Sequence, residues 1–523
     1  MEVNTGLLNT QVTCTCGKTH HVPIERVVVG ENITNDLVLF LNQKGFRNLL
    51  VVADANTDEA FGGQVRSQLR EAGFQVEAYV FTNRHGLLPD EAAILAVRKA
   101  LHPSAGAEGA EGAEGAEGAE GAEGAEGAEG AEGAEGAEGA EGAEGAEGAE
   151  GATNCSQFRA RRTDGKPCPD GVSVDVVVAV GSGVIHDIVR YVTFNEGLPF
   201  ISIATAPSMD GYASGMAAMQ FHGIKVTTRA WPPIAIFAEL SVLMKAPFAL
   251  VQSGFGDLAG KVTSLSDWIL AAGLHGEYFC SMAYEMVYEP LEYVLSHADE
   301  LLRRDSEAVK NLFLGLVNAG IAMAVVGNSR PCSGSEHHCS HFWDLLAFKG
   351  IREHTSHGLQ VGYAVHWTAL LYRYLLEERR HELLRPVLAP VVTDSFIRYA
   401  SDFYGDGDRE VIAFQREKAQ WLASHPYVMS QPDVGVVHRA LVSMMPGMPM
   451  TTLFDKLDDA LSRMDIPLSP GFLEIDAEWL RQTFYHAREL RARLTIFDVI
   501  ASQDWLEDAM TKIFRPGESV GGK

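Results

Sequence analysis

The sequence lacks any segment that would carry it into or across a membrane. It has no uninterrupted run of about 18 apolar residues, the length that a transmembrane helix requires. The N-terminus, MEVNTGLLNTQ, has neither the basic start nor the apolar stretch of a secretory signal. We therefore expect a cytoplasmic protein without stable membrane insertion.

Cysteine is scarce, and its pattern does not fit a disulfide-bonded secreted fold. The seven cysteines are an odd number and lie scattered along 523 residues, which favours a reducing compartment. Cys14 and Cys16 lie close to His20 and His21 and could bind a metal ion, but no second Cys pair lies near them in the sequence. The spacing alone therefore gives little weight to a zinc site here.

The chain has fewer basic than acidic residues. The chain has 42 Lys and Arg against 69 Asp and Glu, a formal net charge of −27. Fifteen of the carboxylates belong to fifteen Gly-Ala-Glu triplets between Gly106 and Glu150, and outside them 42 basic residues face 54 acidic ones, a balance of −12. Neither value favours a nucleic acid or an anionic membrane as a partner.

The triplets also lack proline and any apolar side chain larger than alanine. Glycine at every third position is found in collagen, but the collagen triple helix also needs proline. Glycine opposes helix formation, and closely repeated glutamates repel one another. We expect residues 104–172 to be an insertion, with 104–152 a disordered acidic loop. The other 454 residues are enough for two domains.

The first half of the remaining chain has an α/β pattern. Short β-rich runs at 25–30, 48–54 and 76–81 alternate with helical patterns at 33–44, 59–72 and 90–101, and further strands are expected at 173–180 and 199–205. Alternation at this spacing predicts parallel βαβ units. We expect residues 1–245 to form a Rossmann-like dinucleotide-binding domain that the insertion interrupts.

Two strand ends carry features of nucleotide binding. The strand at 173–180 leads into Gly181-Ser182-Gly183 and then a helix, a turn whose backbone N–H groups can approach a pyrophosphate. The full glycine fingerprint is absent, because His186 stands where its third glycine would be. Asp54 ends the strand at 48–54, where an acidic side chain can hold the ribose 2′-hydroxyl of NAD and repel a 2′-phosphate.

From residue 246 onward the pattern is helical. Long helices are expected at 265–288, 291–302, 306–325, 360–376, 409–423 and 477–502. We therefore expect residues 246–523 to be an all-α domain, and the catalytic cleft to lie between it and the α/β domain.

The helical half holds a group of potential metal ligands. His337 and His341 lie one turn apart on an expected helix, and His354 and His357 follow shortly after it. Asp257 follows a Gly-x-Gly turn, where it reads equally well as the N-cap of an apolar helix or as a carboxylate ligand. An Asp-His-His set with an open position suits Zn²⁺, Ni²⁺ or Fe²⁺.

Several motifs resemble one family closely. They are GSGVIHD at 181–187, TAPSMDGYAS at 205–214, GFGDLAGK at 254–261, SGSEHHCSH at 333–341, HGLQVG at 357–362 and the N-terminal CTCGKTHHVPIE. They are similar to those of the sn-glycerol-1-phosphate dehydrogenases, particularly the bacterial AraM-type enzymes. That family belongs to the iron-containing alcohol dehydrogenase and dehydroquinate synthase-like superfamily. The resemblance covers the chain except for 104–172.

The resemblance implies roles for individual residues. It implies Asp257, His337 and His357 as metal ligands, with His341 as a catalytic, substrate-binding residue and Asp210 as another substrate contact. It implies that NAD(P) is bound by Asp54, by Gly181, Ser182, Gly183, Val184, Ile185, His186 and Asp187, and by Thr205, Ala206, Pro207, Ser208 and Ser214. The family often has Thr-Ile-Asn where this chain has Val184-Ile185-His186. His338 and His354 leave the choice of ligands among neighbours partly open.

The activity implied is metal-dependent, reversible reduction of dihydroxyacetone phosphate by NAD(P)H to sn-glycerol 1-phosphate, which would feed phospholipid synthesis. Asp54 favours NADH, and the metal is one divalent ion. Lys261 and Arg330 are candidate cations for the phosphate, and we expect a homodimer. The alternatives are a glycerol or other polyol dehydrogenase, a dehydroquinate synthase-type lyase and a non-catalytic nucleotide-binding protein.

Overall fold

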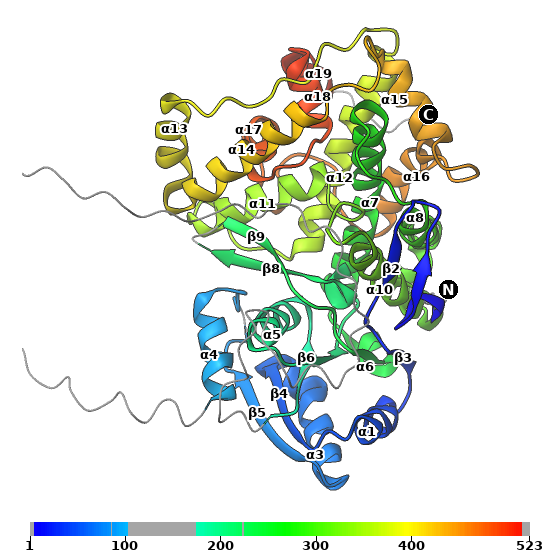
Figure 1. Cartoon of the computed structure of the whole chain (residues 1–523), viewed down its shortest axis with the longest axis vertical. Coiled ribbons are helices and arrows are strands. Elements are labelled where there is room, and N and C mark those ends of the chain that lie inside the picture. The colour runs from blue at the N-terminus through cyan, green and yellow to red at the C-terminus, as the bar shows by residue number, and fades with distance from the viewer. Residues whose placement is uncertain (1–4, 85, 103–173, 222–223, 515–523) are drawn as a thin grey trace, which may run out of the picture.

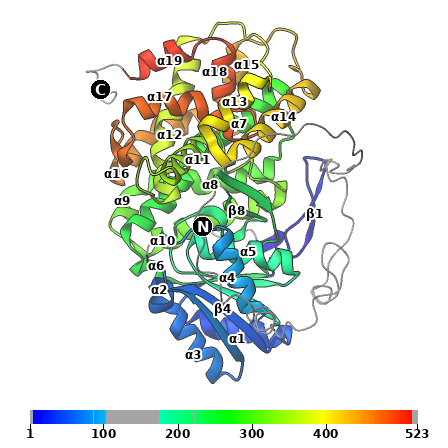
Figure 2. The ribbon, with the colours of Figure 1, turned by 90° about the vertical axis from the view of Figure 1, so that its left-hand side faces the viewer.

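The computed structural model describes residues 5–84, 86–102, 174–221 and 224–514. The insertion expected at 104–172 lies outside these residues. Figures 1 and 2 show a sheet with its flanking helices at one end of the molecule and a larger assembly of helices at the other.

The first part is built on a six-stranded sheet in the order β3-β10-β7-β6-β4-β5. Every neighbouring pair is parallel, as the alternating pattern predicted. The strands are β3 (Arg26–Gly30), β4 (Asn48–Asp54), β5 (Gln75–Phe81), β6 (Val176–Gly181), β7 (Phe200–Ala204) and β10 (Ala235–Glu239). The sequence analysis missed β10, which forms an inner strand between β3 and β7.

Helices cover both faces of this sheet, because successive strand residues point to opposite sides. On one face Val51 and Val178 pack with α1 (Ile33–Lys44) and α3 (Gly63–Glu71). On the other, Val52 and Val177 pack with α4 (Glu91–Leu101) and α5 (Gly183–Glu196). The result is the doubly wound, Rossmann-like arrangement that the sequence predicted.

The strand order reverses between β4 and β6. The chain leaves β4 toward β5 on one side and leaves β6 toward β7 on the other. Ligands of open α/β sheets bind at such a switch point, beyond the carboxyl ends of the strands. Asp54 and the Gly181-Ser182 turn therefore lie where a dinucleotide is expected.

Two hairpins lie outside the sheet. β1 (Gln11–Thr13) pairs with β2 (Thr19–His21), and β8 (Met216–Phe221) pairs with β9 (Ile224–Arg229). Figure 1 shows the first hairpin beside α8 and α10 of the helical part, and the second close to α11. Neither was predicted from the sequence.

The rest of the chain is helical, as expected. The main helices are α6 (Leu240–Lys245), α7 (Phe248–His275), α8 (Ser281–Ser296), α9 (Ala298–Leu302), α10 (Ser306–Val326), α11 (Ser335–Phe348), α12 (His357–Arg373), α13 (Asp394–Tyr404), α14 (Asp408–Ser424), α15 (Val434–Ser443), α16 (Met450–Arg463), α17 (Ala477–His486), α18 (Ile496–Ser502) and α19 (Leu506–Ile513). α10 is long and apolar enough to span a membrane, but 83% of its most apolar window is buried inside the protein.

Three helix predictions were wrong in their bounds. The helix expected at 265–288 is two helices, because Gly276 takes a left-handed conformation (φ 69°) that ends α7. The helix expected at 291–302 is also divided, since α8 ends at Ser296 and α9 begins at Ala298. The helix expected at 477–502 breaks as well. There Thr495 and Asp498 form a capping box that begins α18.

Candidate active site

Glycines bring α7 and α12 into backbone contact at the centre of the site. A Cβ atom at Gly256 would lie 2.3 Å from the carbonyl oxygen of Gly358, and one at Gly362 would lie 2.8 Å from the Cα of Gly256. Because both helices have only hydrogen at these positions, they pack closer than side chains would allow. The residues next to these glycines, Asp257 and His357, are thereby brought together.

The prediction that Asp257 could open its helix as an N-cap was wrong. α7 begins at Phe248, so Asp257 lies in its interior and is completely buried. The Gly-x-Gly sequence before it is helical, and its glycines serve packing instead. Gly254 lies against Pro207, whose carbonyl oxygen would be 1.8 Å from an added Cβ.

Asp257, His337 and His357 converge as a potential metal site. Each offers one ligand atom, and the three atoms lie within 4.8 Å of one another. They come from α7, α11 and α12, and Nε2 of His337 is 3.6 Å from Oδ1 of Asp257. One carboxylate and two imidazoles form the donor set of a catalytic site with an open position.

Neighbouring groups orient both histidine rings. Nδ1 of His337 is 2.7 Å from Oε1 of Glu336, and Nδ1 of His357 is 3.0 Å from Oγ of Ser340. Glu336 also accepts hydrogen bonds from the Gly334 N–H and the Thr263 hydroxyl. With each Nδ1 engaged, Nε2 is left for a metal, the usual arrangement for histidine ligands. The sequence analysis missed Glu336 and Ser340.

The protonation states also suit metal binding. Burial raises the pKa of Asp257, but the ammonium of Lys261 and the hydrogen bonds from Lys261 and the Asp210 N–H outweigh burial and hold the pKa below its usual value. Burial lowers the pKa of His337 and His357 well below the usual range. The carboxylate is therefore ionised and the two imidazoles are neutral, as ligation requires.

Both candidate cations for a phosphate are already engaged. Nζ of Lys261 lies 2.7 Å from Oδ1 of Asp257, 2.6 Å from Oδ2 of Asp210 and 3.0 Å from the carbonyl oxygen of Cys332, and its side chain is fully buried. Arg330 is buried and pairs with Glu277 at 3.0 Å. Lys261 therefore balances the charge of two carboxylates, and neither residue lines the cavity described next.

A cavity of about 320 Å³ opens beside the metal ligands. His337, His341 and His357 line it, as do Asp210 and Lys225. The ring of His341 stacks parallel to that of His357 with centroids 5.9 Å apart. Lys225, on β9, is the one Lys or Arg among the described lining residues, and its Nζ is 3.4 Å from Nδ1 of His357. No sequence motif indicated Lys225.

The loop that carries Asp210 is fixed against two helices. The N–H of Asp210 donates to Oδ2 of Asp257 at 2.8 Å. Gly320 of α10 lies so close to the loop that a Cβ would be 2.6 Å from the Asp210 carbonyl oxygen. Burial and the nearby charge of Asp257 raise the pKa of Asp210 to about 6, although Lys261 opposes this. The loop is thus held as part of the cavity wall.

A larger cavity of about 840 Å³ lies over the strand ends of the sheet. It is lined by Asp54 at the end of β4, Ser182 after β6 and Thr205 after β7. Ser182 and Leu250 line both cavities. The two cavities therefore adjoin at these residues, one over the sheet and the other beside the metal ligands.

The other predicted cofactor residues divide into two groups. Gly183, Val184, Asp187, Ser208 and Ser214 line the smaller cavity, whereas Gly181, Ile185, His186, Ala206 and Pro207 line neither. Within the second group, the His186 ring turns back onto its own helix, with Nδ1 2.8 Å from the carbonyl oxygen of Ser182. A Cβ at Gly181 would lie 2.7 Å from Ile185. Gly181, Ile185 and His186 therefore shape the turn, and the side chains of Ile185 and His186 are buried.

Of the two extra histidines, His338 is buried on α11 and lines neither cavity. His354 lies at the smaller cavity with its side chain 52% exposed, and its Nε2 is 3.9 Å from Asp344. Neither belongs to the group formed by Asp257, His337 and His357.

Comparisons with known proteins bear on the fold and the family. Residues 163–247 match the family model described as iron-containing alcohol dehydrogenase, and 102–155 match the collagen triple helix repeat. The fold is similar to that of an iron-containing alcohol dehydrogenase from Thermococcus thioreducens, with a TM-score of 0.51 at 13% identity over 94% of this chain and 98% of that one. Because the identity is low, this likeness concerns the fold alone.

The relatives found by sequence similarity identify the family more narrowly than the fold does. The glycerol-1-phosphate dehydrogenase of Halalkalibacterium halodurans, with NAD(P)+ in its name, is 31% identical over 362 residues, which cover 69% of this chain and 74% of the relative. The corresponding protein of Bacillus subtilis is 28% identical over 363 residues, covering 69% and 75%. The chain belongs to the glycerol-1-phosphate dehydrogenase family.

Proposed function

We propose that this protein reduces dihydroxyacetone phosphate to sn-glycerol 1-phosphate with NAD(P)H, and catalyses the reverse reaction. One observation carries the proposal: the Asp257, His337 and His357 ligand set lies at a cavity, lined by the two histidines, that adjoins the larger cavity over the sheet. The relatives named glycerol-1-phosphate dehydrogenase support the choice of substrate.

Asp257, His337 and His357 would hold one divalent ion, either Zn²⁺, Ni²⁺ or Fe²⁺. Such an ion acts as a Lewis acid toward a carbonyl oxygen. NAD(P)H would lie in the larger cavity, with its pyrophosphate at the N-terminus of α5 beside Ser182 and its ribose near Asp54. The nicotinamide supplies the hydride. The carboxylate of Asp54 favours NADH over NADPH.

The substrate would lie in the smaller cavity, within reach of Asp210 and His341. Burial lowers the pKa of His341 well below its usual value, so the ring is neutral. A neutral imidazole can both donate and accept a hydrogen bond, which suits a residue that positions a hydroxyl group and takes part in moving its proton. We assign His341 this role.

The phosphate would bind at Lys225. The Lys225 side chain is 17% exposed, unlike the fully buried Lys261, and its Nζ lies 3.6 Å from Oδ2 of Asp344. With Asp344 and His357 as its neighbours, the ammonium still has a hydrogen for a ligand, because Lys carries three donors. A phosphate there would accept a charge-assisted hydrogen bond from the Lys225 ammonium.

The test compares two substrates in NADH oxidation, dihydroxyacetone phosphate and dihydroxyacetone. We expect the phosphorylated ketone to have the far higher kcat/KM. Lys225→Met should raise the KM for the phosphorylated ketone by about 10- to 100-fold, since a hydrogen bond to a charged group contributes roughly 1.5–3 kcal/mol. It should leave dihydroxyacetone turnover unchanged.

Lys310→Met is the matched control, because Lys310 is a surface lysine of α10 whose nearest charge is Glu307 at 4.0 Å. Equal kcat/KM for both ketones would point instead to a polyol dehydrogenase. A uniform loss in Lys225→Met with both ketones would mean that Lys225 supports the fold rather than the phosphate.

The break between the last strand, β10, and the helices that follow supports a division into a dinucleotide-binding domain, 1–245, and a metal- and substrate-binding domain, 246–523. We also propose a cytoplasmic homodimer. Sedimentation of the purified protein tests the dimer.

A further inference from the structure

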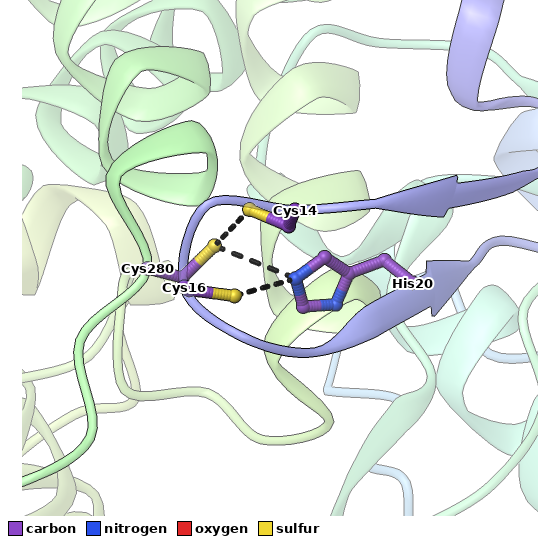
Figure 3. A group of neighbouring side chains, drawn as sticks. All are labelled: Cys14, Cys16, His20 and Cys280. Atoms are coloured by element: carbon purple, nitrogen blue, oxygen red, sulfur yellow. Dashed lines mark hydrogen bonds between the residues drawn. The ribbon is translucent and has the colours of Figure 1, made fainter.

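A second group of metal-binding side chains lies far from the active site. Cys14 and Cys16 belong to the turn between β1 and β2, His20 lies on β2, and Cys280 directly precedes α8. Figure 3 shows the three sulfur atoms and the His20 ring nitrogen pointing toward a common centre. The four potential ligand atoms all lie within 4.8 Å of one another.

Two separations among these atoms match those of a tetrahedral zinc site, and a third is shorter. Ligand sulfurs about 2.3 Å from zinc are separated by about 3.8 Å, and a sulfur and an imidazole nitrogen by about 3.6 Å. The Sγ atoms of Cys14 and Cys280 are 3.8 Å apart, and Cys280 Sγ is 3.6 Å from His20 Nε2. Cys16 Sγ is 3.2 Å from the same nitrogen.

The three cysteines of the cluster are reduced, and nearby hydrogen bonds hold the turn that carries two of them. A sulfur separation of 3.8 Å is far beyond a disulfide bond of about 2.05 Å, and all three cysteines are free. The turn is closed by the Cys14 N–H, which donates to the Lys18 carbonyl oxygen at 2.9 Å. Gly17 takes φ 85°, which favours glycine. The Tyr278 hydroxyl lies 3.2 Å from Cys16 Sγ, where it can donate to a thiolate.

We propose that Cys14, Cys16, His20 and Cys280 bind one structural zinc ion that fastens the N-terminal hairpin to the helical part of the protein. Three thiolates and one imidazole form a closed Cys₃His set with no position left for a substrate. Thiolates select zinc over the ions that prefer oxygen ligands. The site is thus independent of the Asp257 cluster in both chemistry and place.

The position of the site indicates that the ion would link the N-terminal hairpin to the helical part. Cys14 and Cys280 are 266 residues apart in the sequence, so the bound ion would close a long loop across the whole α/β part. The other contacts here are weaker than metal bonds: Thr15 and Ser281 share a hydroxyl contact at 3.3 Å, Lys18 lies over the Tyr278 ring at 3.7 Å, and Val12 packs against the apolar core of the helices. Metal bonds would hold the hairpin far more firmly than these contacts.

The test removes the active-site ligands first, so that only one site is counted. In the His337→Ala/His357→Ala double variant of the full chain, elemental analysis should find one equivalent of zinc per chain. Adding His20→Ala or Cys16→Ser should reduce that to none. The matched control is His21→Ala, since His21 is the next residue on β2 and does not belong to the cluster.

A second measurement uses the unmodified protein, in case these variants do not fold. Alkylation by N-ethylmaleimide, read by peptide mass mapping, should spare Cys14, Cys16 and Cys280 until a strong zinc chelator is added. All three should then react as one equivalent of zinc is released.

Three results would overturn the proposal. One is zinc that persists in the double variant after His20→Ala. Another is alkylation of Cys14 and Cys16 that does not depend on the chelator. The third is a Cys14–Cys280 disulfide in protein prepared with reductant present.

Discussion

The two walls of the catalytic cleft are built in different ways. On the sheet wall, Asp54 is the last residue of β4, and Ser182 and Thr205 directly follow β6 and β7. On the helical wall, Asp257, His337 and His357 come from three separate helices, and the ligand set depends on their side chains. Strand register positions the first wall, whereas close helix packing positions the second.

This difference predicts where the protein tolerates change. Parallel pairing places the ends of β4, β6 and β7 at one edge whatever side chains follow them. The helical wall depends instead on buried charges that balance one another and on glycines at backbone contacts. Substitutions there should cost the most, and the predictions below run from the largest effect to the smallest.

Removing a ligand from the helical wall should have the largest effect. Asp257→Asn, His337→Ala and His357→Ala should each lose most bound metal and lower kcat by roughly 10³-fold or more. A Lewis acid supplies several kcal/mol of transition-state stabilisation, and about 1.4 kcal/mol corresponds to a factor of ten. Elemental analysis and kcat from one preparation provide the check, and full metal occupancy in any variant would remove that residue from the ligand set.

The second-largest effect is expected when His341 is replaced. His341→Ala should keep its metal and lower kcat/KM for dihydroxyacetone phosphate by roughly 10²–10⁴-fold, the usual cost of one positioned proton donor. His354→Ala is the comparison, because this half-exposed ring also lines the cavity and should matter much less. A metal-free His341→Ala protein would show that His341 is itself a ligand.

Adding one methyl group to the contact between α7 and α12 should disturb the site without removing a ligand. Gly256→Ala should lower both Tm and metal content, because its Cβ meets the backbone of Gly358 and overpacking typically costs about 1–3 kcal/mol. Gly273→Ala in the same helix is the control, since its Cβ would meet one atom, the Cβ of Ala440, at 3.4 Å. If both variants behave alike, the glycine contact does not set the geometry of the site.

The smallest effect is expected on the sheet wall. Oδ1 of Asp54 accepts hydrogen bonds from the N–H groups of Asn56 and Thr57, both at 2.9 Å, and so caps a short helix. Asp54→Asn keeps an oxygen for this cap and removes the charge. It should narrow the preference for NADH by lowering the KM for NADPH, with Tm unchanged. If the KM values for NADH and NADPH keep the ratio they have in the unmodified protein, Asp54 has the capping role alone.

The sequence predicted the features that depend on neighbouring residues. The bounds of β4 were predicted correctly because its apolar run is continuous and ends at Asp54. The helix that carries His337 and His341 was also found, since no glycine or proline interrupts it between Gly334 and Gly350. Both features are local, so short-range patterns were sufficient to locate them.

Features that depend on distant residues could not be predicted in this way. Gly254 and Gly256 resemble a helix start in sequence, and their packing role appears only with Pro207 and Gly358 in place. Lys225 reaches His357 from a hairpin that no pattern indicated. Cys14, Cys16 and His20 lacked a fourth ligand in their own segment, because Cys280 completes the group from 266 residues beyond Cys14.

The most direct test of this difference between the two walls uses the Asp257→Asn variant. Its NADH binding is measured by fluorescence titration, and its turnover of dihydroxyacetone phosphate is measured on the same preparation. If the sheet wall binds the cofactor and the helical wall activates the ketone, NADH should bind with a Kd close to that of the unmodified protein while turnover is lost. Loss of NADH affinity together with turnover, or turnover that persists without bound metal, would contradict the account.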